Sequence, residues 1–145
     1  MEALFGQAGS WGLLVLRIAL GVVFIYHGYP KFFKVPPIGG AAGFAQFLRM
    51  MGIPAPLFFA WVVAVLEFWG GIALILGLAT RWLGLLFAID MLVAIIRAKA
   101  ARGVRFMAMD TTGWEFDFVL LAGALALMLL GAGAYSLDAL WGLRI

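Results

Sequence analysis

The sequence predicts an all-α membrane protein: residues 1–145 form a single four-transmembrane-helix bundle, with an interfacial amphipathic segment between helices 1 and 2. The chain is 66% hydrophobic and 12% charged, whereas soluble domains average about 45–50% and about 25%. Its 10 basic and 7 acidic residues cannot cover so much apolar surface. Because one span takes about 20 apolar residues, this length allows four spans and no separate catalytic domain.

The first span is predicted over residues 11–29, with Ser10 as its N-cap and Pro30 ending the helix. Met1 to Ser10 contain no Lys or Arg, so this apolar run is expected to stay as an anchor rather than act as a signal peptide. The following linker contains apolar residues at helical spacing, which predict a helix lying along the interface or a lid over a cavity: Phe44, Phe47, Leu48 and Met51.

The second and third spans are predicted over residues 57–77 and 82–96, and the very short turn between them makes a tight hairpin. The fourth is predicted over residues 113–133. Thr112 and Glu115 fit a capping box at its start. Ser136 is expected to cap a final turn.

The distribution of Lys and Arg predicts the orientation. Because cytoplasmic loops carry the excess of basic residues, both termini are expected outside the cytoplasm, with the protein in the inner (cytoplasmic) membrane. We interpret the net charge of +3 as a topology signal and expect the lipid bilayer, not nucleic acid, as the partner. Connections one and three hold seven basic residues, namely Lys31, Lys34, Arg49, Arg97, Lys99, Arg102 and Arg105, against Arg81 and Arg144 on the other side.

Residue content excludes several kinds of site. There is no cysteine, so disulfides, thiolate metal sites and iron–sulfur clusters are absent. A single histidine excludes bis-histidine haem. We therefore expect no protein-bound metal and no covalently bound cofactor.

Three ionisable residues lie within the predicted spans: Arg17, Glu67 and Asp90. Each costs roughly 2.5–3.5 kcal/mol at a helix centre, which favours a structural or functional reason for it. At about 1.5 Å per residue, Arg17 lies roughly 9 Å below the outer surface and the two acids roughly 13–15 Å below it. We therefore expect Arg17 to pair with Glu67, Asp90 or both.

Two interpretations of this polar core stay open. It is either a structural ion pair that locks the bundle, or a site where Glu67 or Asp90 handles protons or binds a ligand. One arginine against two acids leaves a surplus negative charge in a low dielectric, which favours the second interpretation. Arg17, Gly21 and Gly28 share one helix stripe, and small residues there allow close helix packing.

A second polar cluster is expected near the cytoplasmic ends of the spans, formed by His27, Glu115 and Asp117. A neutral histidine beside a carboxylate is a sensible proton donor to a quinone-like oxygen. The alternative is an interfacial histidine that is hydrogen-bonded to a loop. Glu115 also fits the capping box, whereas Asp117 lies in the first turn of an apolar helix, where the helix dipole favours it.

The spans contain a weak internal repeat. Gly21, Phe24 and His27 match Gly84, Phe87 and Asp90 in type and spacing, and Arg17 and Arg81 precede the two sets. This indicates either a duplicated helical hairpin or a chance similarity.

The chain resembles the DoxX family of small four-helix membrane proteins over nearly its whole length. The similar residues are Leu16-Arg17, Gly21, His27-Gly28, Lys31, Gly43-Phe44, Met51 to Pro56, Leu66-Glu67, Gly70-Gly71, Gly77, Arg81 and Gly131 to Asp138. Many members have a histidine just after the third span, where this chain has Arg97-Ala98-Lys99. A role that depends on that histidine is therefore in doubt.

The resemblance implies a four-helix bundle and a link to respiratory or redox-stress complexes. Some relatives are membrane subunits of thiosulfate:quinone oxidoreductase, and others are partners of soluble oxidative-defence enzymes. The leading hypothesis is therefore an auxiliary subunit that binds a quinone-like lipophilic ligand among Arg17, Glu67, Asp90 and His27. It leaves open whether the protein is itself an enzyme.

The alternative is a non-catalytic anchor or assembly factor that docks a soluble partner, such as a redox protein. Its docking residues would be the basic set of the third connection, Arg97, Lys99, Arg102 and Arg105. A small transporter is a third hypothesis, and it requires a homo-oligomer because four short spans enclose little aqueous volume.

Overall fold

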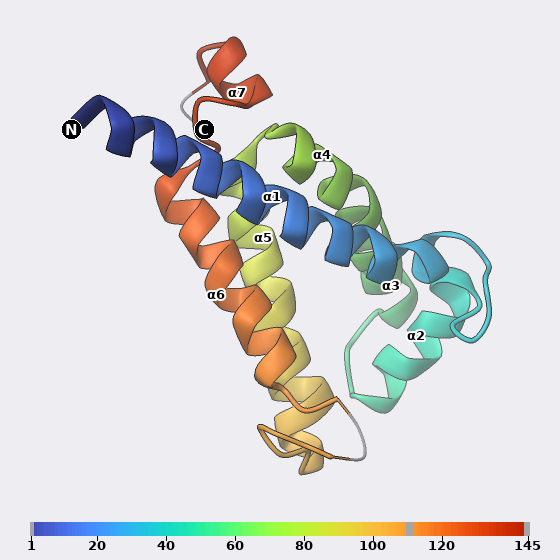
Figure 1. Cartoon of the computed structure of the whole chain (residues 1–145). Helices are drawn as coiled ribbons and strands as arrows, with labels where there is room; N and C mark the ends of the chain where they lie inside the picture. Colours follow the sequence, from blue (N-terminus) through green and yellow to red (C-terminus); the bar gives the residue numbers. More distant parts are fainter. Residues whose placement is uncertain (1, 110–111, 144–145) are drawn as a thin grey trace.

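The computed structural model describes residues 2–109 and 112–143, and within these ranges all regular structure is helical, which confirms the all-α prediction (Figure 1). The longer helices are α1 (Glu2–Phe32), α2 (Gly40–Met50), α3 (Pro56–Val65), α5 (Thr80–Val93) and α6 (Glu115–Leu130). α3 runs without interruption through the π-helical η1 (Leu66–Gly70) into α4 (Gly71–Leu76). α5 continues into the π-helical η2 (Ala94–Lys99) and the 3₁₀ turn η3 (Ala100–Arg102), and α7 (Leu137–Leu140) follows α6.

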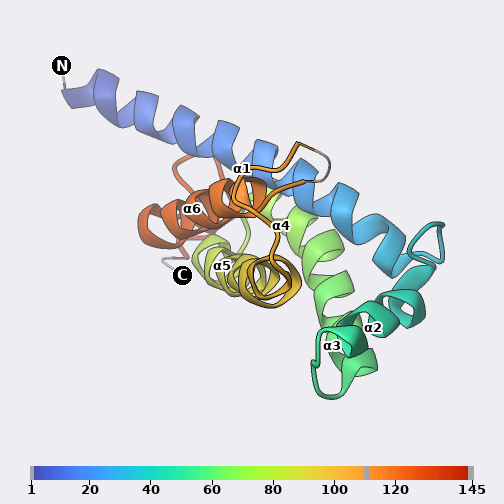
Figure 2. The same cartoon turned by 90° about the horizontal axis from the view of Figure 1, so that it is seen from below.

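The helices form two groups that α1 joins. α5 and α6 lie side by side as one pair, while α2, α3 and α4 form the other group (Figures 1 and 2). α1 runs obliquely across both groups and packs mainly on α4 and η1. The N-terminus, the α4–α5 turn and α7 lie at one end of the molecule, and α2 and the η3–α6 connection lie at the other (Figure 1). Below, these are called the α7 end and the α2 end.

Two helical segments are long and apolar enough to cross a membrane: Ala8–Phe32, with mean hydropathy 2.0, and Pro56–Leu76, with mean hydropathy 2.1. The second lies within one residue of the predicted segment at each end. Large apolar side chains also cover the outer surface, as at Val15, Val119 and Leu129, which are each more than 60% exposed. Such a surface fits a lipid environment and not water.

The ends of the first helix differ from the prediction. α1 begins at Glu2 and not at Ser10, whose hydroxyl instead accepts a hydrogen bond from the Ala134 backbone N–H at 3.3 Å. It also continues through Pro30 to Phe32. The proline removes one hydrogen bond in the last turn, to the carbonyl of the exposed Tyr26, which is a smaller loss than in a helix interior.

The capping prediction for the fourth span was also wrong. α6 begins at Glu115, its N-cap position is Trp114, and no side chain caps it. Ser136 does cap the last turn, because its hydroxyl oxygen accepts a hydrogen bond from the Ala139 backbone N–H at 3.1 Å. The expected amphipathic segment is α2, whose Ala41, Ala45 and Leu48 are buried and pack with Ala60 of α3.

Glycines bring the long helices into backbone contact. A Cβ atom at Gly21 of α1 would lie 2.7 Å from the Gly71 carbonyl oxygen of α4. A Cβ atom at Gly84 of α5 would lie 2.7 Å from the Ala124 carbonyl oxygen of α6. Neither site has room for a larger residue, so these glycines set the helix spacing.

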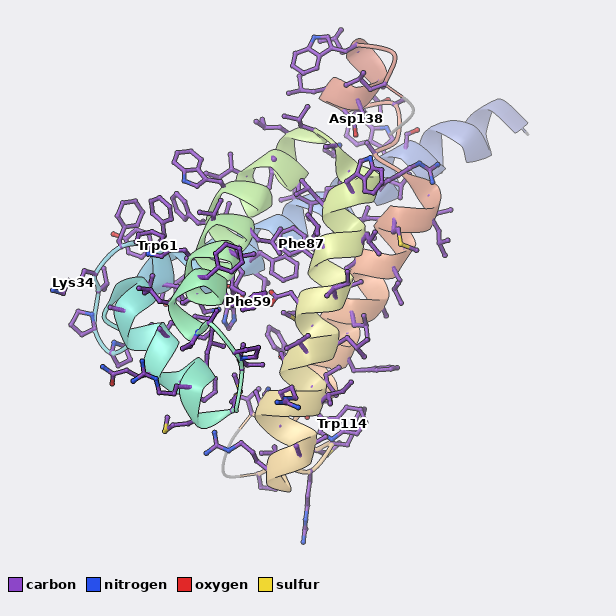
Figure 3. All side chains as sticks on the ribbon, turned by 180° about the vertical axis from the view of Figure 1, so that it is seen from behind. Lys34, Phe59, Trp61, Phe87, Trp114 and Asp138 are labelled. Atoms are coloured by element: carbon purple, nitrogen blue, oxygen red, sulfur yellow. The ribbon has the colours of Figure 1, made fainter. Side chains whose placement is uncertain are left out.

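The C-terminal turn closes the α7 end of the bundle. The Asp138 carboxylate accepts hydrogen bonds from the Ala79 N–H at 2.7 Å and the Thr80 N–H at 2.9 Å, so it caps the start of α5 from a distant part of the chain. The Asp138 N–H donates to the Gly77 carbonyl at 2.9 Å. Arg17, fully buried, donates to the Tyr135 carbonyl. Figure 3 shows Asp138 between α7 and the α4–α5 turn.

Asp138→Ala is expected to lower the stability of the folded protein by about 1–3 kcal/mol, because two backbone N–H groups lose their acceptor. Thermal unfolding in detergent measures this as a lower Tm. Asp138→Asn keeps one acceptor oxygen and serves as the control, with an intermediate Tm. Equal Tm values for Asp138→Ala and the native chain would contradict the capping role.

Candidate functional site

The centre of the site is a buried ion pair between Lys31 of α1 and Glu67 of η1. Their side chains are 11% and 4% exposed. Lys31 also lies over the Phe44 ring of α2, with its Nζ 4.7 Å from the ring centroid. The pair therefore joins the end of α1 to both α2 and η1.

Gly28 allows α1 and η1 to come close enough for this ion pair to form. A Cβ atom at Gly28 would lie 2.5 Å from the Phe68 backbone nitrogen and 2.8 Å from the Glu67 Cβ atom. α1 and η1 therefore touch one turn before Lys31, and the short separation places the ammonium at the carboxylate. The π-helical geometry of η1 is a rare form that often marks functional sites.

A cavity of about 170 Å³ lies beside the ion pair. Five helical segments supply its walls: α1, α2, η1 with the end of α3, α5 with η2, and the first turns of α6. Its polar lining residues are His27, Lys31, Glu67, Asp90 and Asp117. The remaining lining is apolar, with Phe24, Phe44, Phe47 and Met51 among the larger side chains.

Two of the three acids at this cavity are already paired. Glu67 binds Lys31, and Asp117 lies 2.6 Å from the Lys99 Nζ. Asp90 is different, because it forms no ion pair with any described residue, and its Oδ2 atom, which is shielded from solvent, also accepts no hydrogen bond from them. His27 is exposed and lies at the rim, with its ring centroid 5.9 Å from that of Phe116. The cavity therefore offers one free carboxyl oxygen and one imidazole.

The predicted pairing of Arg17 with Glu67 or Asp90 is wrong. Arg17 binds the Tyr135 carbonyl at the α7 end, and Glu67 binds Lys31. Glu67 is level with Gly28, and the eleven-residue step from Arg17 to Gly28 spans about 16 Å of helix. An arginine side chain cannot cross that distance.

Lys31 is the functional-site residue that the sequence analysis missed. Ending the first helix before Pro30 placed Lys31 in a loop, where it counted only as a topology charge. The available signal was the i, i+4, i+7 stripe of Phe24, Gly28 and Lys31.

The expected second polar cluster joins the first one only in part. Asp117 and His27 line the same cavity as Glu67 and Asp90. Glu115 does not line it; its carboxylate turns back toward Gly113 at the start of its own helix. The structure therefore combines two predicted clusters into one, without Arg17 and Glu115.

Three of the four proposed docking residues contact the protein itself. Arg97 donates to the carbonyls of Met51 and Gly52 at 3.2 and 3.3 Å. Lys99 pairs with Asp117, and the Arg102 guanidinium lies 6.0 Å from the Phe47 ring centroid. These contacts hold η2 and η3 against α2 and α6 at the α2 end of the cavity.

Two of the three matched positions of the internal repeat lie close together, whereas Gly21 packs on Gly71 and Gly84 packs on Ala124. The rings of Phe24 and Phe87 stack with centroids 3.8 Å apart, and His27 and Asp90 line the same cavity. Arg81 donates to the carbonyls of Met128 and Leu129, much as Arg17 donates to that of Tyr135.

The fold and the cavity together define a helical integral membrane protein with a charged site enclosed among its apolar helices. The chain belongs to the DoxX family, whose profile matches residues 12–100. No solved structure matches it significantly.

Three relatives illustrate the relationship. The putative oxidoreductase CatD of Bacillus subtilis (strain 168) is 38% identical over 127 residues, which cover 88% of this chain and 84% of CatD. Inner membrane protein YqjF of Escherichia coli (strain K12) is 34% identical, covering 89% of this chain and 91% of YqjF. Inner membrane protein YphA of the same strain is also 34% identical, covering 92% and 93%.

Lys31→Met is expected to destabilise the fold by about 3–5 kcal/mol, because it leaves the Glu67 carboxylate buried without its cation. Unfolding by denaturing detergent measures the loss.

The double variant Lys31→Met/Glu67→Met removes both charges and is expected to recover most of that stability. A double variant less stable than Lys31→Met would show that the two residues do not act as a pair.

Proposed function

We propose that this protein binds a quinone-like lipophilic ligand in the cavity beside the Lys31–Glu67 pair, as an auxiliary subunit of a redox complex. In this proposal four helical rods cross the inner membrane, namely α1, α3–η1–α4, α5–η2 and α6, with both termini outside the cytoplasm. The α2 end then faces the cytoplasm.

The observation that carries the proposal is the free carboxyl oxygen of Asp90 in a cavity whose other acids are paired. An unsatisfied polar atom in a low dielectric is costly, and a ligand that donates a hydrogen bond removes that cost. A hydroquinone hydroxyl is such a donor. The aromatic lining from Phe24, Phe44 and Phe47 suits a flat ring.

His27 provides the second polar contact. It lies at the rim of the cavity, where its ring is accessible from outside, whereas the Asp90 Oδ2 atom is shielded from solvent. A neutral imidazole both donates and accepts hydrogen bonds. A ring that binds between His27 and Asp90 and carries an oxygen at each end has one hydrogen-bond partner for each oxygen. Both partners are able to exchange protons with the ring oxygens.

The name of one relative agrees with a redox role. CatD is described as a putative oxidoreductase, and it shares 38% of its residues with this chain over the aligned region. The described residues supply proton-handling groups, so in this proposal the electron-transfer step belongs to the ligand or to a partner subunit.

Asp90→Asn is expected to weaken hydroquinone binding by about tenfold or more, because the strong carboxylate acceptor is lost and the amide donors face the ligand hydroxyl. Titration of the purified protein with a hydroquinone, followed by quenching of tryptophan fluorescence, measures the affinity. Asp138→Asn is the control, because it makes the same chemical change at the α7 end. Unchanged binding by Asp90→Asn, or no binding by the native chain, would refute the proposal.

A second function is the docking of a soluble partner, and one observation favours it. Arg105 is exposed in the η3–α6 connection beside exposed apolar residues, Phe106 and Met107. Arg105→Glu is expected to abolish recovery of such a partner while leaving hydroquinone binding unchanged. Loss of both properties, or of neither, would argue against separate docking and ligand sites. Co-purification from the native membrane measures the first property.

A further inference from the structure

A groove on the outer surface lies next to the cavity, between the α3–η1 helix and α5. It encloses about 500 Å³ and is lined only by apolar side chains and a glycine, among them Trp61, Val62, Leu66, Gly70, Leu83 and Leu86. Trp61, Val62 and Leu86 are each more than 40% exposed, so the groove opens outward where the proposed bundle faces lipid.

The groove and the cavity share two walls. Leu66 and Gly70 of η1 line the groove, and Glu67 between them lines the cavity. On α5, Leu86 lines the groove and Asp90, one turn further, lines the cavity. The two hollows are therefore neighbours along the same pair of helices.

Phe87 separates them. It is fully buried, and a Cβ atom at Gly70 on the groove side would lie 3.3 Å from its ring. Its other side stacks on Phe24, which lines the cavity. Figure 3 shows Phe87 at the interface between α5 and the α3–α4 helix. This pair of aromatic rings therefore forms part of the partition between the groove and the charged cavity, and such rings are able to change rotamer.

The volumes of the cavity and the groove indicate which part of a ligand each of them can hold. Sites for drug-sized ligands enclose about 300–1,000 Å³. The cavity, at about 170 Å³, is too small for such a ligand but accommodates a single substituted ring. A ligand with a longer apolar part needs the adjoining groove, whose lining offers no charged group to a polar head.

We propose that the groove between α3–η1 and α5 holds the apolar isoprenoid tail of a membrane-dissolved quinone whose head occupies the cavity, and that the ligand enters from the bilayer past Phe87. The inference rests on the proposed function and specifies its substrate class: a tailed lipid quinone, taken laterally from the membrane. Small water-soluble quinones would use the cavity alone.

Photolabelling of the native chain in lipid nanodiscs tests this. The probe is a benzoquinone with a short isoprenoid tail that carries a diazirine. Labelling at Val62, Leu66, Leu83 or Leu86 is expected to disappear when the same quinone without the diazirine is added in excess. Labelling at Val119, a lipid-facing residue of α6, is expected to persist, because contact there is non-specific.

Matched variants locate the tail. Val62→Trp places a larger side chain in the groove and is expected to lose the competable labelling while it still binds a benzoquinone without a tail. Val119→Trp makes the same change on α6 and is expected to keep both properties. A diazirine-bearing isoprenoid alcohol without a quinone head is expected to give no competable labelling.

The outcomes separate this inference from the proposed function. If benzoquinone binds but groove labelling is no more competable than labelling at Val119, the tail site is refuted and the cavity site survives. If the headless isoprenoid labels the groove as well as the quinone does, the groove binds lipid chains in general and the inference is refuted. If no quinone binds at all, both proposals are refuted.

Discussion

The burial of a lysine ammonium at the end of α1 is the constraint on which the site depends. Lys31 cannot remain charged among apolar helices without a carboxylate, and Glu67 supplies it. That pairing requires α1 to continue past Pro30. It also requires a glycine at position 28, where the backbones of α1 and η1 are in contact. It also leaves Asp90 without a cation of its own. The free carboxyl oxygen is thus a consequence of how the other charges are satisfied.

The two ends of the bundle have opposite properties. At the α7 end, Arg17 ties α1 to the Tyr135 carbonyl, and Asp138 ties the C-terminal turn to Gly77 and to the start of α5. At the α2 end, the short helix α2 covers the charged cavity. The Arg97 side chain donates a hydrogen bond to the Met51 carbonyl at the end of this helix. The α7 end thus joins the C-terminal segment to α1 and α5, and the α2 end leaves a cavity among the helices.

Hydropathy alone predicted the helical class and the positions of the long helices, because apolar runs of that length have few alternative structures. It also placed Glu67 and Asp90 at a similar depth, and the structure brings both to one cavity together with His27, which had been assigned to a separate cluster. The pairing of charges was not predictable in the same way, since it depends on the tilt of α1 and on contacts between backbones. A one-turn error at Pro30 was enough to assign Lys31 to a loop and to give Glu67 the wrong partner. Asp138, distant in sequence from α5, gave no local signal of its capping role.

The π-helical form of η1 has an evolutionary consequence. A π-helical turn commonly corresponds to an α-helix with one extra residue, so deleting one residue between Leu66 and Gly70 would restore a regular ladder. Because a π-helical turn holds one residue more than an α-helical turn, the helix on either side would keep its orientation while the side chains within the turn change position. A relative could in this way lose the carboxylate opposite Lys31 while keeping every span intact. Loss of the charged site and loss of the fold are therefore separable events in this architecture.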